Sequence, residues 1–262
     1  MPFSQVDASP DPEFLIDYLE RAAAALEPVK ADLRSLAAAG GRGPVLDLGC
    51  GIGHDLVAWA GAGITAVGVD ASLLMLDRAA SRAAHAGAVL RLAGARGEGL
   101  PFRSKSLAGC LADRVLQHVA DPLAVLHEVE RVLRPGARIA IFEPDWGSLT
   151  LDADDHEAVV ALSAQLAASA PQRRVGLHLR RLLVNAGFVG VEVTLAPVAV
   201  TSLEGLGRLT GVESALQRIA DLGVLGVARM EAFRDQLEQR SAQGTFFATL
   251  NRFIARAEAG AR

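Results

Sequence analysis

The first part of the chain carries apolar residues at helical spacing. Between Pro12 and Leu36 they recur every three or four positions, and Asp11 precedes them where a helix cap is expected. Residues 12–36 therefore predict one or two amphipathic helices. Three glycines and Pro44 then break the helical pattern.

Strand-like and helix-like stretches alternate from residue 44 to residue 142. Short runs rich in Val, Ile, Leu and Ala predict strands at 44–49, 64–70, 88–92, 107–112 and 138–142, and helical spacing predicts helices at 72–85 and 122–133. This alternation is typical of βαβ units around a parallel sheet. The pattern predicts an α/β fold of the doubly wound, Rossmann-like kind.

After Glu143 the pattern becomes more helical. Helices are predicted at 154–170, 177–186, 203–222 and 227–239, and strands at 189–200, which Pro197 interrupts, and at 245–254. Roughly 40 residues thus separate the last two strands, more than a hairpin connection needs, so we expect a helical cap there. The predicted division is an N-terminal helical lid segment (1–43), a Rossmann-like domain (44–200 and 244–257) and a cap insertion (201–243).

Composition narrows the classes of function. The 262 residues are 51% hydrophobic, and 30 acidic against 26 basic residues give a net charge of −4, which argues against a broad basic surface for nucleic acid. No apolar run is long enough for a membrane span, and residues 1–12 are too polar for a signal peptide, so we expect a cytoplasmic protein. Cys50 and Cys110 stand alone in apolar stretches, which predicts neither a disulfide nor a zinc site.

The most informative stretch is Val45–His54, an apolar run that ends in alternating glycines. Gly49, Gly51 and Gly53 would let a ligand lie directly on the backbone, and the amides of a following helix would hold an anionic group. A dinucleotide fingerprint would require a third glycine where His54 stands. The turn therefore predicts a small, partly anionic ligand bound with a different glycine spacing.

The segment Asp47-Leu-Gly-Cys-Gly-Ile-Gly53 resembles motif I of class I S-adenosylmethionine-dependent methyltransferases, in the branch similar to the ubiquinone and menaquinone biosynthesis enzymes. Further blocks in the same order resemble that family, at residues 68–72, 99–102, 113–119, 133–138 and 143–147, so the resemblance covers about residues 11–256. It implies S-adenosylmethionine as cofactor and a seven-stranded, mostly parallel sheet with an antiparallel last strand. It also implies methyl transfer to oxygen, carbon or nitrogen of a small, apolar or aromatic acceptor of the secondary-metabolite kind.

The resemblance also implies which residues bind the cofactor. Asp70 would hold the ribose hydroxyls, or would cap the helix that begins near Ser72. Met75 would pack on adenine, and Asp47 would orient loop amides or a water near the methionine amino group, or serve only the buried turn. The full set is Asp47, Gly49, Cys50, Gly51, Gly53, Asp70, Ala71, Met75, Ala95, Arg96, Asp113 and Arg114.

One block departs from the family. Aligned from Pro101, Arg96 stands where the family carries the aspartate that accepts a hydrogen bond from the adenine amino group. Backbone groups near Ala95 and Arg96 would then read the adenine, or cofactor affinity would be weaker, or the loop would be rearranged.

Candidates for the acceptor side follow the fourth strand. His118 is a candidate base with Gln117 as its positioning partner, and the alternative is a solvated or core histidine. Tyr18 and Trp146 would line an aromatic acceptor pocket, or would only pack under the cap. The acidic residues at 152–157 are expected from a helix dipole, so no metal is predicted.

Several functions stay open beside small-molecule methylation. The chain could bind S-adenosylmethionine without methyl transfer, as a scaffold or in another pathway step, and a nicotinamide-dependent dehydrogenase is a third class. Methylation of a protein is also open, whereas residues 112–115 lack the motif of enzymes that methylate nucleic-acid bases. We therefore predict a small-molecule partner, no nucleic acid and no membrane, and we leave a homodimer open.

Overall fold

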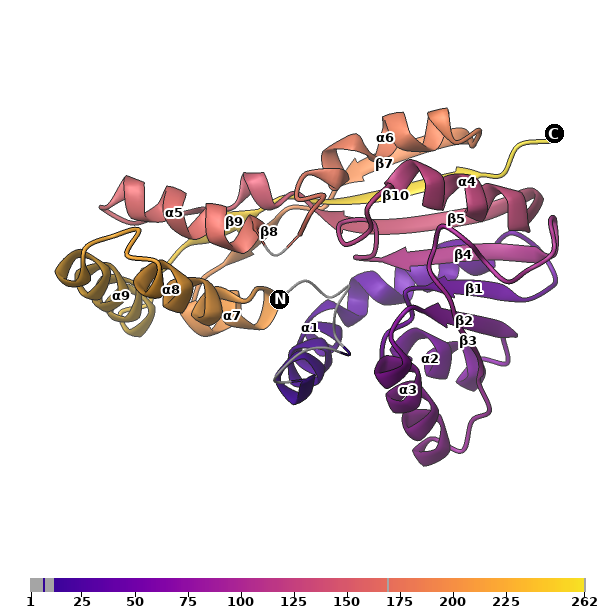
Figure 1. Cartoon of the computed structure of the whole chain (residues 1–262), viewed down its shortest axis with the longest axis horizontal. Helices are drawn as coiled ribbons and strands as arrows, with labels where there is room; N and C mark the ends of the chain where they lie inside the picture. Colours follow the sequence, from indigo (N-terminus) through magenta and orange to yellow (C-terminus); the bar gives the residue numbers. More distant parts are fainter. Residues whose placement is uncertain (1–6, 8–11, 169, 262) are drawn as a thin grey trace.

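The computed structural model describes residue 7, residues 12–168 and residues 170–261. It has two lobes, and the C-terminal segment 248–258 runs from one into the other, with the N-terminal helix between them (Figure 1). Helix α1 (Pro12–Ala38) is continuous through Pro28, so the predicted segment forms one helix. Its buried Leu26, Leu33 and Ala37 pack against the larger lobe.

A seven-stranded sheet forms the larger lobe. Its order is β3-β2-β1-β4-β5-β10-β7, and β10 runs antiparallel to both of its neighbours. This confirms the predicted Rossmann-like sheet with an antiparallel last strand. The strands are β1 (Val45–Leu48), β2 (Ala66–Asp70), β3 (Arg91–Gly94), β4 (Leu107–Asp113), β5 (Leu133–Pro144), β7 (Val189–Leu195) and β10 (Arg252–Glu258).

Helices cover both faces of this sheet, with α1, α2 and α3 on one face and α4 and α6 on the other (Figure 1). Two of them begin at side-chain caps: the Ser72 hydroxyl accepts from the Met75 amide, and the Asp121 carboxylate accepts from the amides of Leu123 and Ala124. The helices are α2 (His54–Gly61), α3 (Leu73–His85), α4 (Pro122–Val132) and α6 (Val175–Asn185).

The smaller lobe packs four helices around a three-stranded sheet of order β6-β9-β8. Leu162, Leu216, Phe233 and Phe246 lie at its buried centre. Its elements are the 3₁₀ turn Trp146–Ser148, β6 (Thr150–Leu151), α5 (His156–Ala167), β8 (Val198–Val200), α7 (Leu203–Leu209), α8 (Val212–Asp221), α9 (Val227–Ala242) and β9 (Ala248–Leu250). The apolar core of this lobe therefore includes residues on both sides of the predicted boundary at 200.

Three predicted elements are wrong in detail. The strand expected at 189–200 is divided beside Pro197 into β7 and β8, which belong to different sheets. The single strand expected at 245–254 is two strands in different sheets, because the chain leaves β9 at Asn251, whose carbonyl accepts from the Asp145 amide, before β10 begins. The helix expected at 203–222 is broken at Thr210–Gly211 into α7 and α8. In the part of the chain that the structure describes, no helix has both the length and the apolar character that crossing a bilayer requires.

Candidate functional site

A cavity of about 470 Å³ opens at the carboxyl ends of the parallel strands. The strand order reverses between β1 and β4, which is where open α/β sheets bind their ligands. We call one end the turn half: Gly49, Gly51, Asp70, Ala71, Met75 and residues 95–98. The other end, the roof half, is formed by Tyr18, Gln117, His118, Phe142, Trp146, Arg218 and Arg252.

The glycine turn after β1 forms the floor of the turn half. Gly49, Gly51 and Gly53 have φ angles of 65°, 51° and 80°, which L side chains rarely adopt. A Cβ at Gly49 would lie 2.7 Å from Val115 Cγ2, whereas a Cβ at Gly51 would meet no atom of the described residues within 4 Å. The turn thus leaves its open side toward the cavity at Gly51, where a ligand can lie directly on the backbone.

The Asp70 carboxylate is fixed beside this turn. Its Oδ2 accepts from the Gly51 amide at 2.9 Å, and its Oδ1 accepts from the Ser72 amide at 2.9 Å. Each carboxylate oxygen can accept a second hydrogen bond, so both can still take a ligand hydroxyl. Burial raises the pKa of Asp70, and these amides oppose that rise. The cap of α3 is Ser72, so the alternative reading of Asp70 as that cap is wrong.

The loop after β3 forms one wall of the turn half. Ala95, Arg96, Gly97 and Glu98 all line the cavity, but the Arg96 side chain is 77% exposed whereas that of Glu98 is 28% exposed. A carboxylate therefore lies on this wall two residues after the position where the family's aspartate is missing. Glu98 was not among the predicted site residues, because it lies two positions beyond the one that aligns with the family's aspartate.

Three predicted cofactor residues do not line the cavity: Asp47, Cys50 and Gly53. Gly53 precedes α2, and a Cβ there would lie 2.8 Å from Ala79 Cβ. The Cys50 thiol is buried against Gly68. The Asp47 side chain is buried, and its Oδ2 has no hydrogen-bond partner among the residues that the structure describes. Its pKa is well above the usual range because of burial first and the neighbouring carboxylates second. These residues support the turn from behind.

A buried charge network ties α1 to the cavity wall. Lys30 Nζ lies 2.5 Å from Asp55 Oδ2 and 2.6 Å from Asp113 Oδ2, and Arg34 Nη1 lies 2.8 Å from Asp55 Oδ1. Arg114 Nε lies 2.9 Å from the other oxygen of Asp113. Burial opposes ionisation of Asp113, but Arg114 and Lys30 outweigh it and hold the pKa of that carboxyl well below its usual range. Asp113 is therefore an anion shared by two cations.

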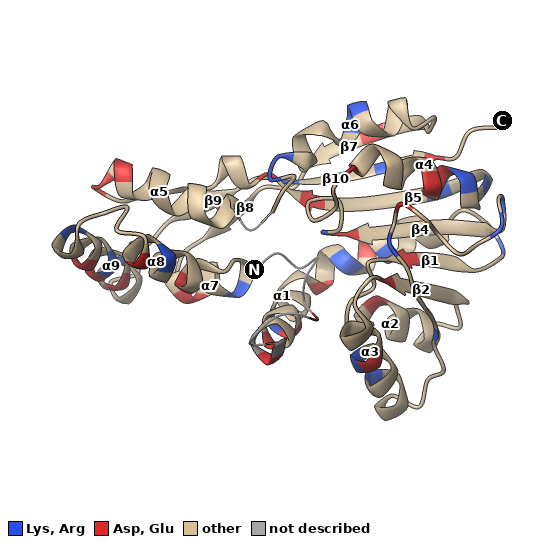
Figure 2. Ribbon diagram, in the orientation of Figure 1, with Lys and Arg blue, Asp and Glu red and all other residues tan. Residues whose placement is uncertain are grey.

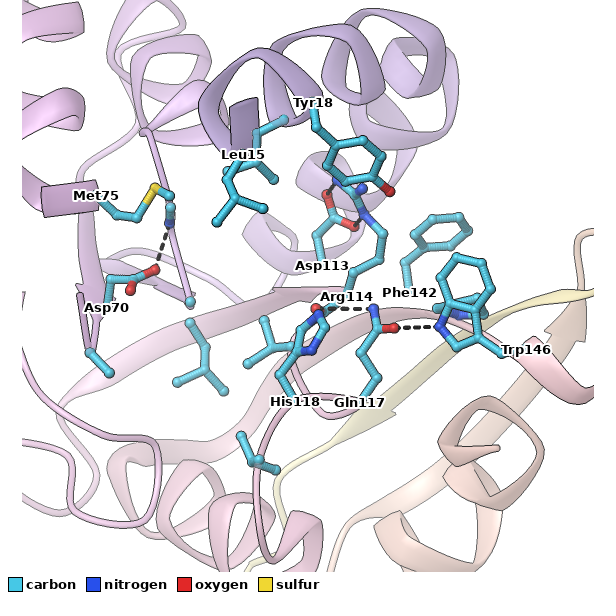
Figure 3. A pocket seen from close by; sticks show the side chains of 18 of the residues that line it. Leu15, Tyr18, Asp70, Met75, Asp113, Arg114, Gln117, His118, Phe142 and Trp146 are labelled. Carbon is cyan, nitrogen blue, oxygen red and sulfur yellow. Dashed lines mark hydrogen bonds and ion pairs between the residues drawn. The ribbon is translucent and has the colours of Figure 1, made fainter. Parts of the chain in front are cut away.

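Beyond β4, polar side chains continue from the turn half into the roof half (Figure 3). Arg114 has a φ of 56°, unusual for a residue other than glycine, and its carbonyl accepts from Gln117 Nε2 at 3.3 Å. Gln117 Oε1 in turn accepts from the indole Nε1 of Trp146 at 2.7 Å. The structure thus brings together Gln117 and Trp146, which were predicted from separate motifs.

His118 lies beside Gln117 and lines the cavity (Figure 3). Burial, together with the positive charge of Arg114, lowers the pKa of His118 to about 4. The imidazole is therefore neutral near pH 7, and its conjugate acid is disfavoured by its surroundings.

Tyr18 closes the cavity from above. Its hydroxyl donates to the Leu209 carbonyl at 3.1 Å, so α1 meets α7 of the smaller lobe across the opening. The ring faces Arg114 in Figure 3. Both predicted acceptor-side aromatics, Tyr18 and Trp146, thus line the cavity.

Glu143 supports this end of the site without lining it. The carboxyl is fully buried at the end of β5, and Oε1 accepts from the Leu116 amide at 2.6 Å. Burial raises the pKa of Glu143 to about 8, which leaves the group largely protonated at neutral pH.

The acidic residues at 152–157 lie away from the cavity and pair with α9. Arg240 binds Asp152 and Asp154, and Arg229 binds Asp155 and Glu157. Acidic and basic residues alternate along this helix (Figure 2). Ion pairs between the helices of the smaller lobe account for the cluster.

The cavity also has lining residues that the sequence analysis did not single out: Leu15, Phe142, Arg218 and Arg252, besides Glu98. Arg218 lies on α8 and Arg252 begins β10, more than 130 residues along the chain from the turn at 49–53. No local motif marks them, because only the packing of the two lobes brings them to the cavity.

Comparison with known proteins decides the family. A family model described as a methyltransferase domain matches residues 46–141. A protein of transposon TN4556 from Streptomyces fradiae, described as an uncharacterized 37.1 kDa protein, is 34% identical over 256 residues, which cover 96% of this chain and 72% of that protein. The chain is a class I S-adenosylmethionine-dependent methyltransferase.

Other proteins match shorter parts of the sequence or share the fold. O-methyltransferase resE of Aspergillus sclerotiorum is 32% identical over 154 residues, 57% of this chain and 56% of that enzyme. The YcgJ protein of Bacillus subtilis superposes with a TM-score of 0.62 at 19% identity, covering 91% of this chain and 99% of that one. A geranyl diphosphate methyltransferase superposes with a TM-score of 0.59 at 19% identity, covering 89% and 78%. The two structural likenesses show a shared fold.

Proposed function

We propose that this methyltransferase transfers the methyl group of S-adenosylmethionine to an oxygen, nitrogen or carbon atom of a small molecule with an apolar or aromatic body. The observation that carries the proposal is one continuous cavity whose turn half offers backbone amides and the Asp70 carboxylate, and whose roof half offers Trp146, Phe142 and Tyr18. The second half would hold the acceptor directly beside the methyl donor.

The residues of the turn half fit the cofactor. When bound, S-adenosylmethionine supplies an activated methyl group on a sulfonium, so the protein needs mainly to align the acceptor and exclude water. The free hydrogen-bonding capacity of Asp70 suits the ribose diol, and the open face of Gly51 suits the methionine moiety. Met75 would pack on the adenine ring, and Glu98 would accept from its amino group in place of the missing aspartate.

In the roof half, we assign positioning and acid–base roles. Gln117, held by Arg114 and Trp146, would orient the acceptor beside His118. A neutral imidazole can accept the proton that an acceptor hydroxyl or amine releases, although its low pKa makes His118 a weaker base than a solvated histidine. A carbon acceptor with no acidic proton would need only to be oriented by Gln117, without proton transfer to His118.

We further propose that α1 is a lid and that the smaller lobe is a cap over the acceptor. The hydrogen bond from Tyr18 to Leu209 supports this assignment, because it joins the two across the cavity. A cytoplasmic location and a role in secondary metabolism remain predictions. The similarity to O-methyltransferase resE supports oxygen as one of the possible acceptor atoms.

The test combines binding and turnover. Titration calorimetry with S-adenosylmethionine and S-adenosylhomocysteine should show one site per chain, and transfer of a labelled methyl group should appear on members of a panel of phenols, aromatic acids and amines. Binding with no turnover on any small molecule or protein would favour the alternative of a cofactor-binding protein that does not transfer methyl groups. Methylation of a protein but of no small molecule would contradict the proposed acceptor class.

A further inference from the structure

Two arginines in the roof half lack a carboxylate partner. Arg218, on α8, and Arg252, at the start of β10, both line the cavity and are half-buried. Among the described residues, no Asp or Glu oxygen lies within 4 Å of either guanidinium, whereas Arg114 on the same wall is paired with Asp113. The roof half therefore carries two positive charges with no local counter-charge.

Each of the two guanidinium groups is held in place by weak contacts that leave most of its donors unused. Arg252 Nε donates to the Ala196 carbonyl at 3.3 Å, and its guanidinium carbon lies 5.4 Å from the centre of the Phe142 ring. Arg218 Nη2 donates to the Gln165 carbonyl at 3.1 Å. A guanidinium has five N–H donors in a fixed fork, so most of them remain available to a ligand.

Burial of such a cation is unfavourable unless an anion compensates it. Burial lowers the pKa of Arg218 and of Arg252, and for Arg252 the charge of Arg114 lowers it further. Three acidic side chains line the cavity in the described part of the chain: Asp70 and Glu98 in the turn half, and Asp113, which Lys30 and Arg114 already neutralise. The protein itself therefore does not supply the compensating charge.

Apart from Tyr18, Gln117 and His118, much of the wall around the two arginines is apolar. Trp146, Phe142, Leu166, Val198, Leu209 and Leu250 line it, so water that solvates the arginines must share the space with hydrophobic side chains. An occupant with an apolar body and one anionic group would satisfy both features at once.

We infer that the methyl acceptor is an amphipathic anion, whose carboxylate or phosphate binds Arg218 and Arg252 while its apolar body packs on Trp146 and Phe142. This inference rests on the proposed function, since it names the acceptor class for the same cavity. It also explains why the acceptor half is cationic in a chain whose net charge is negative.

The test is calorimetry with three probes of one shape on the full chain, with and without saturating S-adenosylhomocysteine: 1-naphthoate, 1-naphthyl phosphate and neutral 1-naphthamide. We expect at least one anion to bind about tenfold or more tightly than the amide, as hydrogen bonds to a charged group imply. The tighter of the two anions identifies carboxylate or phosphate as the natural group.

Variants attribute the preference to the two arginines. Arg252→Met and Arg218→Met keep an unbranched apolar side chain. Each should weaken binding of the anion about tenfold and leave the affinities for naphthamide and S-adenosylhomocysteine unchanged. Arg256→Met is the matched control, since Arg256 lies on the same strand, pairs with Glu192 and does not line this cavity. It should bind all probes as the wild type does.

The inference is overturned if the amide binds as tightly as both anions, if neither anion binds, or if the Arg252 and Arg218 variants bind the anions like the wild type. The titrations without S-adenosylhomocysteine measure only how the probes bind to the arginines. Failure of this inference can therefore be distinguished from failure of the proposed function. That failure would appear as no uptake of S-adenosylhomocysteine by a protein that still prefers the anions.

Discussion

The two halves of the cavity are built in different ways. The turn half is made of main-chain amides, glycines and the carboxylates of Asp70 and Glu98 at or after the ends of neighbouring strands, and its residues all lie between 49 and 98. The roof half is made of side chains from α1, the loop after β4, β5, the 3₁₀ turn, α8 and β10. The first depends on local backbone geometry, whereas the second exists only when the two lobes and α1 are packed together.

The difference predicts how substitutions act. A change in the turn half should affect one ligand strongly and the fold weakly, because its groups sit on rigid strand ends. A change in the network that joins α1 to β4 should affect stability first, because its charges are buried together.

The largest expected effect is at the floor of the turn half. Gly51→Val should abolish binding of S-adenosylhomocysteine, because a side chain at this residue would fill the open face of the turn and its φ of 51° disfavours a β-branched residue. Calorimetry measures the loss. Gly63→Val is the matched control, since Gly63 has a φ of 72° and an open surrounding but does not line the cavity. Equal binding by the two variants would contradict the placement of the ligand.

The next effect is on stability, at the junction of the halves. Lys30→Met should lower the free energy of unfolding by about 3 kcal/mol, the low end for removal of one partner from a buried pair, because Arg34 and Arg114 still face the stranded carboxylates. Urea unfolding measures it. Arg103→Met, on the exposed surface, is the control and should change little. A Lys30 variant as stable as the control would show that the network does not hold α1.

Asp70→Ala tests how much the carboxylate of the turn half contributes to cofactor binding. The substitution should weaken binding of S-adenosylhomocysteine by about 1–3 kcal/mol, because hydrogen bonds from the ribose to a charged carboxylate are lost. Asp70→Asn keeps one acceptor oxygen and should fall between alanine and the wild type. The thermal unfolding midpoint without ligand serves as the check that the turn remains folded. Unchanged affinity in both variants would remove Asp70 from the site.

Glu143, beside the roof half, should make the free energy of unfolding of the protein depend on pH. Its pKa is raised from 4.5 to about 8, so its contribution is fully present below pH 4.5 and is lost as the pH rises toward 8. Over that window the wild type should lose roughly 1 kcal/mol per pH unit relative to Glu143→Gln, which carries no proton to release. Urea midpoints at pH 5, 6.5 and 8 measure the difference. Parallel pH trends in the two proteins would contradict the buried protonated state.

The smallest expected effect concerns His118. Because burial and Arg114 lower its pKa to about 4, the imidazole is already neutral at pH 6, and the rate of methyl transfer should not follow a histidine titration between pH 6 and pH 8. The single-turnover rate across that range measures this. A rise in rate with a midpoint near 6.5 that disappears in His118→Gln would show that the imidazole titrates like a solvated one.

The same contrast explains what could be predicted from the sequence. The Rossmann-like sheet was predicted from the alternation of strands and helices, and the glycine turn from the 47–53 motif. Both predictions were possible because strand ends and tight turns depend on residues that are neighbours in the sequence. Glu98 was not predicted because only the position of Arg96 aligns with the family's aspartate, although the Glu98 carboxylate lies two residues after it. Arg218 and Arg252 carry no local signal, since their position follows from how α8 and β10 pack, and the division of the last apolar run into β9 and β10 follows from pairing with two different sheets.

The most direct test of the account is a crystal structure of the full chain with S-adenosylhomocysteine. We expect both ribose hydroxyls within hydrogen-bond distance of the Asp70 carboxylate, the homocysteine over Gly49 and Gly51, and the sulfur directed toward Gln117 and His118. A nucleoside bound elsewhere, or a turn at 49–53 occupied by protein side chains with Asp70 directed to solvent, would contradict it.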